Sequence, residues 1–120
     1  MTPNAGQTAS VSRVITAGDI AAFIALSGDT NFIHLQDGVA HGLLTASLVS
    51  QLIGTVLPGP GAVWTKADLT FEYPVYAGDT LTATGVIERV YPPLGFLTMS
   101  VLVVNQDKRT VLSADCTVRP

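Results

Sequence analysis

The sequence predicts a single α+β domain in which an antiparallel sheet wraps around one long helix. The hydrophobic pattern changes period at residues 58–61 (PGPG), with helical spacing before this point and strand alternation after it. A chain of 120 residues that is 48% hydrophobic and 12% charged has enough apolar material for one core. A strongly twisted sheet and one apolar helix can both bury their apolar faces when the helix packs on the sheet.

We expect a flexible polar segment over residues 1–10 and a folded domain over residues 11–120. The first ten residues have neither a basic region nor an apolar region, so no secretory signal is expected. The longest apolar stretch, residues 43–57, is interrupted by polar residues and is too short for a membrane span. A cytoplasmic protein without membrane contact is therefore predicted.

The first half of the chain contains a short predicted strand at residues 11–15 and a helix that begins after Thr16. Asp19 lies three residues after Thr16, and the two form the pattern of a capping box. Gly28 is a natural end for this helix because glycine readily adopts the left-handed conformation of a C-cap. Residues 29–40 are predicted to be turn and loop.

The second helix is predicted over residues 41–57. Its apolar residues cover most of the circumference, and a helix that is apolar nearly all round is buried. These residues are Leu43, Leu44, Ala46, Leu48, Val49, Leu52, Ile53, Val56 and Leu57.

The second half has the alternation of an antiparallel meander. Strands are predicted at residues 63–73, 80–90, 96–105 and 110–118. In this order of elements the sheet encloses the central helix, which is the description of a hot-dog fold. Such a sheet leaves an edge to be covered, and together with the apolar composition this favours a homodimer.

Charge and cysteine content exclude several functions. A net charge of −3 and scattered basic residues provide no surface for nucleic acid. One cysteine, Cys116, cannot form an intramolecular disulfide and lies in the last predicted strand, where it is expected to be a small core residue. No residue spacing indicates a metal site, and no cofactor is predicted.

The residues with the clearest chemical potential lie between the two helices. Asp29 and His34 are five residues apart on a predicted turn, and His41-Gly42 opens the second helix. A carboxylate and an imidazole can activate a water and move a proton. The N-terminus of a helix can stabilise a developing oxyanion. Alone, Asp29 would be interpreted as a turn or capping residue.

Three segments resemble one family. Residues 23–34 (FIALSGDTNFIH) are similar to the signature of the MaoC-like (R)-specific enoyl-CoA hydratases, an aromatic residue followed by Ser-Gly-Asp-x-Asn-Pro-aliphatic-His. Residues 41–47 (HGLLTAS) resemble the start of that family's central helix, His-Gly-Met-Leu-x-Ala-Ser. Residues 69–79 (LTFEYPVYAGD) resemble its later Phe-x-x-Pro-Val-x-x-Gly-Asp stretch. The similarity runs from about Arg13 to the C-terminus.

The resemblance implies a hydro-lyase that reversibly adds water across the 2,3 double bond of a trans-2-enoyl thioester, carried by coenzyme A or by a carrier protein. It implies that Asp29 and His34 hold the water and that Asn31 braces the loop or the pair. The backbone N–H of Gly42 would face the thioester oxygen. The residues expected to contact substrate are Gly28, His41, Leu43 and Ser47.

The chain departs from the family pattern at two places. Phe32 stands where the family usually has proline, and only six residues separate His34 from His41, about half the usual number or fewer. A shorter loop should leave the site more open or leave it to be completed by a partner.

Two other functions remain compatible with the sequence. A hot-dog thioesterase would direct water at the carbonyl carbon and release a free thiol. A non-catalytic thioester-binding or partner subunit would have no need for both Asp29 and His34.

Overall fold

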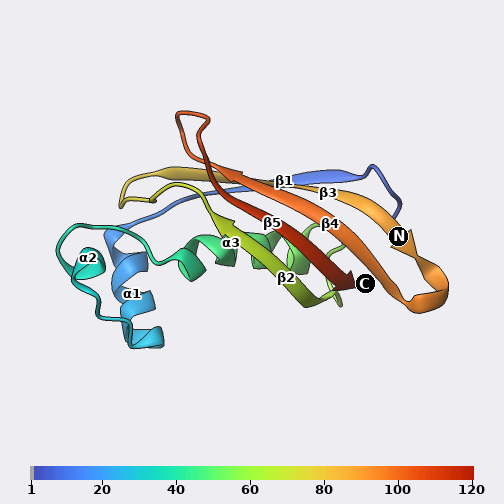
Figure 1. Ribbon diagram of the computed structural model, residues 1–120, viewed down its shortest axis with the longest axis horizontal. Coiled ribbons are helices and arrows are strands. Elements are labelled where there is room, and N and C mark those ends of the chain that lie inside the picture. Colours follow the sequence, from blue (N-terminus) through green and yellow to red (C-terminus); the bar gives the residue numbers. More distant parts are fainter. Residues whose placement is uncertain (1) are drawn as a thin grey trace.

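The computed structural model describes residues 2–120. Its strands form one curved sheet, and its α-helices lie between the first and second strands in the chain (Figure 1). The elements are β1 (Thr8–Val14), α1 (Ala17–Ser27), α2 (Phe32–Leu35), α3 (Gly42–Thr55), β2 (Val63–Phe71), β3 (Thr80–Tyr91), the 3₁₀ turn η1 (Pro92–Leu94), β4 (Phe96–Val104) and β5 (Thr110–Arg119).

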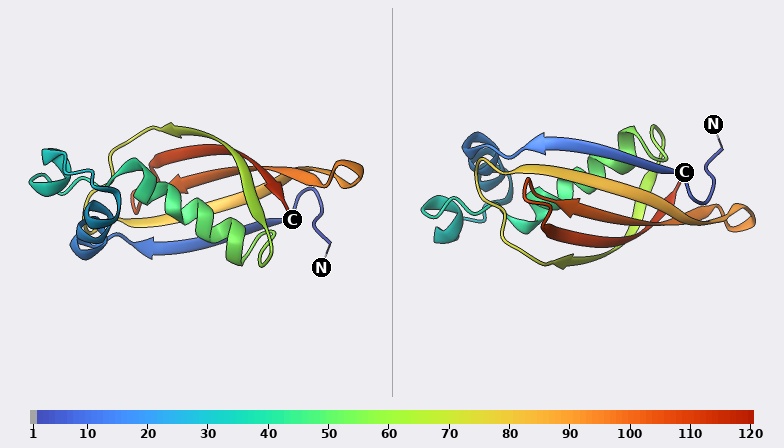
Figure 2. Two further views of the ribbon diagram at one scale, coloured as in Figure 1. Left: turned by 90° about the horizontal axis from the view of Figure 1, so that it is seen from below. Right: turned by 90° about the horizontal axis from the view of Figure 1, so that it is seen from above.

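The sheet has five strands in the order β1-β3-β4-β5-β2, and every neighbouring pair is antiparallel. Helix α3 crosses its concave side, while α1 and α2 lie together at one end of the molecule (Figures 1 and 2). The predicted arrangement, a sheet wrapped around a central helix, is therefore confirmed.

The core lies between α3 and the sheet. Leu48, Leu52 and Ile53 of α3 are almost completely buried there. Gly85 of β3 lies directly against the helix, because a Cβ atom at this position would come within 2.7 Å of Cδ2 of Leu52. A glycine here lets α3 approach the strand closely.

The predicted ends of the first helix are confirmed. Thr16 and Asp19 form the reciprocal hydrogen bonds of a capping box, and Gly28 has a φ of 73° at the C-cap. The prediction of only turn and loop over residues 29–40 is wrong, because α2 forms one helical turn there. Asn31 caps it, with its side-chain oxygen accepting from the N–H of Ile33.

Two strand predictions need correction. Strand β1 begins at Thr8, which pairs with Val86, so residues 8–10 belong to the sheet and not to a separate N-terminal segment. In β2 the register shifts between Trp64 and Lys66. This bulge breaks the expected alternation, so that Trp64 packs against the core while Val63 is 55% exposed.

Helix α3 is not buried on all sides, contrary to the prediction. Leu43 is 61% exposed, and Ser47, Ser50 and Gln51 are exposed on the same face of the helix. Strand β2, at one edge of the sheet, is exposed along most of its length. Ser47, Ser50 and Gln51 recur at the spacing of one helical face, so the polar residues mark this open face although the apolar residues alone did not indicate it.

Cys116 is buried in β5, as predicted, and burial raises the pKa of its thiol to about 11. No helix within residues 2–120 is long and apolar enough to cross a membrane.

Candidate active site

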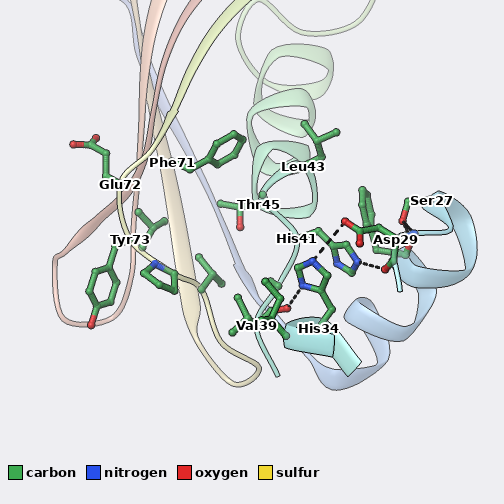
Figure 3. Close-up of a pocket in the computed structure, with 17 residues that line it drawn as sticks. Ser27, Asp29, His34, Val39, His41, Leu43, Thr45, Phe71, Glu72 and Tyr73 are labelled. Carbon is green, nitrogen blue, oxygen red and sulfur yellow. Dashed lines mark hydrogen bonds and ion pairs between the residues drawn. The ribbon is translucent and has the colours of Figure 1, made fainter. Parts of the chain in front are cut away.

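A cavity of about 740 Å³ opens where α1, α2 and the first turn of α3 face the end of β2 (Figure 3). Most of its wall is apolar, and polar groups occur in a few places only. The apolar side chains include Phe23, Ile33, Leu43, Phe71, Val75 and Val111. An apolar cavity with a few convergent polar groups is typical of a small-molecule site.

Asp29 is held at the mouth of this cavity by the end of α1. Its backbone N–H donates to Ser27 Oγ at 3.1 Å, and its Oδ1 accepts from the N–H of Asn31 at 3.2 Å. The second carboxylate oxygen, Oδ2, remains directed at His34, whose Nε2 is 3.6 Å away. A hydrogen bond to Oδ1 therefore orients the carboxylate, and Oδ2 is left facing His34.

His34 is buried and its ring is fixed by the loop that follows it. Nδ1 of His34 lies 2.6 Å from the carbonyl oxygen of Val39. A carbonyl oxygen only accepts, so Nδ1 carries the proton of the neutral ring and Nε2 presents its lone pair toward Asp29. Backbone hydrogen bonds fix this loop in turn. The N–H of Val39 donates to the carbonyl oxygen of Ile33, and the N–H of Ala40 donates to that of Val75.

Phe32 occupies the first position of α2, directly after the capping Asn31. Proline is favoured at this position because its fixed φ suits a helix start and it needs no N–H there. Here the cap by Asn31 and the backbone hydrogen bonds of Val39 and Ala40 hold the segment in place without a proline. The departure at Phe32 therefore leaves the local structure intact.

His41 contacts both His34 and Asp29. Its ring stacks on that of His34 with a centroid distance of 3.6 Å, and its Nε2 lies 3.1 Å from the backbone carbonyl oxygen of Asp29. Nε2 must donate to that carbonyl, which leaves Nδ1 as an acceptor. Nδ1 is buried and has no hydrogen-bond partner within residues 2–120.

Gly42 is the first residue of α3 and lines the cavity. As that of the first helical residue, its N–H lacks an intrahelical partner, and the helix dipole places positive potential there. A Cβ at this position would come within 2.8 Å of the ring of Phe71. The glycine thus accommodates the Phe71 ring beside the helix start.

The structure brings together five of the eight residues that the sequence indicated. Asp29, His34, His41, Gly42 and Leu43 line the cavity. The other three do not: Gly28 is a C-cap, Asn31 caps α2, and the hydroxyl of Ser47 donates to the carbonyl of Leu44 on the open face of α3.

Sequence reasoning missed several residues of the wall. Phe71, Tyr73, Val75 and Val111 form the opposite wall of the cavity. The resemblance of residues 69–79 to the family could have indicated the first three, whereas no sequence signal connects Val111 with Asp29. Thr45, one turn into α3, was detectable, because it lies on the same helical face as His41.

Asp29, His34 and His41 each offer one possible metal-ligand atom, and these atoms lie within 4.8 Å of one another. The two rings are stacked at an interplanar angle of 18°. Ring nitrogens bind metals through lone pairs in the ring plane, so stacked rings cannot converge on one ion unless one of them turns. The arrangement suits proton transfer better than metal binding.

An antiparallel sheet around a central helix, with a carboxylate and an imidazole facing an apolar cavity, defines a hot-dog domain with a candidate hydrolytic or hydrating site. The sequence model described as a MaoC like domain matches residues 1–92. An (R)-specific enoyl-CoA hydratase of Rhodospirillum rubrum is 37% identical, in an alignment that covers 94% of this chain and 85% of that protein. An (R)-specific enoyl-CoA hydratase of Aeromonas caviae is 32% identical, covering 95% of this chain and 92% of that protein.

The fold comparison agrees with these relatives. The solved structure of an (R)-hydratase from A. caviae superposes with a TM-score of 0.93 at 30% identity, and covers 98% of this chain and 97% of that chain. The R-hydratase PhaJ1 from Pseudomonas aeruginosa gives a TM-score of 0.91 at 31% identity, covering 98% and 81%. The chain belongs to the MaoC-like family and has the hot-dog fold.

Proposed function

We propose that this chain is a hydro-lyase that adds water to, or removes it from, the 2,3 double bond of an enoyl thioester, with Asp29 and His34 as its catalytic pair. The two relatives named (R)-specific enoyl-CoA hydratase support this reaction class. Their names also support an (R)-configured 3-hydroxyacyl product.

The separation of Asp29 and His34 is the observation that carries the proposal. At 3.6 Å, Oδ2 and Nε2 are too far apart for a good direct hydrogen bond. Both atoms are acceptors when Asp29 is ionised and His34 is neutral. One water can donate a hydrogen bond to each of them, and a lone pair on its oxygen is then free to attack C3 of the substrate.

The proton balance follows from this arrangement. The pair removes one proton from the water as its oxygen bonds to C3, and returns a proton to C2. Because the same pair handles both atoms from one side of the double bond, syn addition is expected. Dehydration is the same sequence in reverse.

Charge develops on the thioester oxygen while C2 is an enolate carbon. The N–H of Gly42 at the start of α3 is the backbone donor proposed for this oxygen. A fixed donor at the positive end of a helix needs little reorganisation during the reaction. His41 is proposed as a positioning residue, since it holds the Asp29 backbone and stacks on His34.

We also propose that the protein is a homodimer formed through strand β2 and the open face of α3. An edge strand presents unpaired N–H and C=O groups, and pairing with a second β2 would satisfy them. Val63 and Phe71 are exposed on β2 and Leu43 on α3, which gives the interface apolar contacts. Light scattering on the purified protein should give twice the mass of one chain. A monomer would contradict this proposal.

The reaction is tested by following the loss of enoyl-thioester absorbance with trans-2-butenoyl-CoA. Asp29→Asn and His34→Gln should each lower kcat by about 10²–10⁴-fold, the usual contribution of a general acid or base. Asp37→Asn is the matched control, because Asp37 is exposed on the same loop and does not line the cavity.

A thiol reagent in parallel separates this reaction from the alternative. Loss of absorbance without free thiol supports the hydro-lyase, whereas stoichiometric thiol release would identify a thioesterase. A wild-type protein that binds the thioester without turnover would favour the non-catalytic subunit.

A further inference from the structure

Thr45 is a polar residue on the cavity wall to which the proposed mechanism gives no role. It lies in α3 with 2% of its surface exposed and lines the cavity. Figure 3 shows its hydroxyl directed away from the helix, into the space between Phe71 and the two histidines.

The hydroxyl of Thr45 has no hydrogen-bond partner within residues 2–120. A helical threonine usually donates to the carbonyl four residues earlier, which here belongs to His41. That carbonyl oxygen already accepts from the N–H of Leu44 at 3.0 Å and from the N–H of Thr45 itself at 3.2 Å. Both of its lone pairs are used, so the helix offers the hydroxyl no acceptor.

The Thr45 hydroxyl is open to the cavity, because within residues 2–120 the one fully enclosed side-chain polar atom without a partner is Nδ1 of His41 and not Oγ1 of Thr45. A group bound in the cavity can therefore accept a hydrogen bond from this hydroxyl. Thr45 is three residues after Gly42, so the two lie on one helical face. Side chains in a helix lean toward its N-terminus, which brings the Thr45 hydroxyl over the turn that begins with the Gly42 N–H.

We propose that the Thr45 hydroxyl is a second hydrogen-bond donor to the thioester oxygen, acting together with the N–H of Gly42. This inference rests on the proposed hydro-lyase function. Thr45 keeps its proton throughout: it donates a hydrogen bond that strengthens as the carbonyl oxygen gains enolate charge. The largely apolar wall makes such a bond stronger than it would be in water.

The test compares two substitutions of Thr45 with a matched control. Thr45→Val preserves the shape and removes the hydroxyl, while Thr45→Ser keeps the hydroxyl and removes a methyl group. Thr55→Val is the control on the same helix, because the Thr55 hydroxyl is exposed and donates to the carbonyl of Gln51. Thermal unfolding establishes that each variant is folded.

Hydration of trans-2-butenoyl-CoA is measured for all variants, together with the Kd of butanoyl-CoA, which cannot react. Thr45→Val should lower kcat by about 10–100-fold, somewhat less than the loss of a strong oxyanion donor. Thr45→Ser and Thr55→Val should remain within about threefold of wild type. The Kd of butanoyl-CoA should change by less than about threefold in every variant, because the interaction is stronger in the transition state than in the ground state.

Three results would overturn the inference: a fully active Thr45→Val, an equal loss in Thr45→Ser, or a rise in Kd that matches the loss in kcat/KM. The last two would assign Thr45 to packing or to ground-state binding. An inactive wild type would instead refute the proposed function and this inference with it. The two failures are therefore distinguishable.

Discussion

Replacing Gly85 by alanine tests how closely α3 packs on the sheet. The new Cβ would lie 2.7 Å from Cδ2 of Leu52, 3.2 Å from Cε of Met99 and 3.5 Å from Cγ2 of Val101. Favourable carbon–carbon contacts lie at about 3.5–4.0 Å. Leu52 must therefore retreat by about 1 Å, and it is completely buried in a core where side chains are closely packed.

The expected loss of stability combines two effects. Overpacking a core typically costs about 1–3 kcal/mol. Alanine also has less backbone freedom than glycine in the unfolded chain, which recovers about 0.5–1 kcal/mol. With the middle of each range, the net destabilisation expected for Gly85→Ala is about 1 kcal/mol.

Urea denaturation at one fixed protein concentration measures this difference, since dissociation of a dimer would otherwise contribute. Leu52→Ala alone should cost about 2–5 kcal/mol through the cavity it leaves. The double variant should cost less than the sum by at least about 0.5 kcal/mol, because the smaller residue at 52 makes room for the new methyl group. A Gly85→Ala protein as stable as wild type, or strict additivity in the double variant, would refute the close contact.

Two further predictions concern titratable groups. Hydrogen bonds from the Thr16 backbone, and then from Arg13, lower the pKa of Asp19 below its usual value of 3.8. The folded state is therefore stabilised by the ionised Asp19 above pH 3.8, and it loses this contribution as the pH falls through the lowered pKa. Asp19→Asn should destabilise the protein at pH 7, and its effect in urea titrations should shrink as the pH falls below 3.8. An effect of equal size at pH 7 and in acid would contradict this. With a thiol pKa of about 11, Cys116 should be thiolate in only about one molecule in a thousand at pH 8. A disulfide reagent should therefore label it only after unfolding, and rapid labelling of the native protein would show that it is accessible.

Local sequence determined much of the backbone and half of the site. The capping pair Thr16 and Asp19, the C-cap Gly28 and the start of α3 at Gly42 depend on neighbours within a few residues, and each was predictable. Asp29 and His34 are similarly close in the chain, so their pairing follows from the turn between them. The short helix α2 was the exception, because Asn31 can cap a helix or form a turn with equal ease.

Only the tertiary structure decided what surrounds that pair. The stacking of His41 on His34 and the approach of Phe71 to Gly42 join segments that no local pattern relates. The bulge in β2 and the open face of α3 likewise depend on how the strands and the helix pack in three dimensions. Hydrophobic periodicity indicates which residues prefer burial. Whether a sheet edge is free, or a hydroxyl such as that of Thr45 lacks a partner, depends on neighbours that are distant in the chain. The sequence therefore specifies the reacting groups, and the packing of distant segments specifies the cavity in which they act.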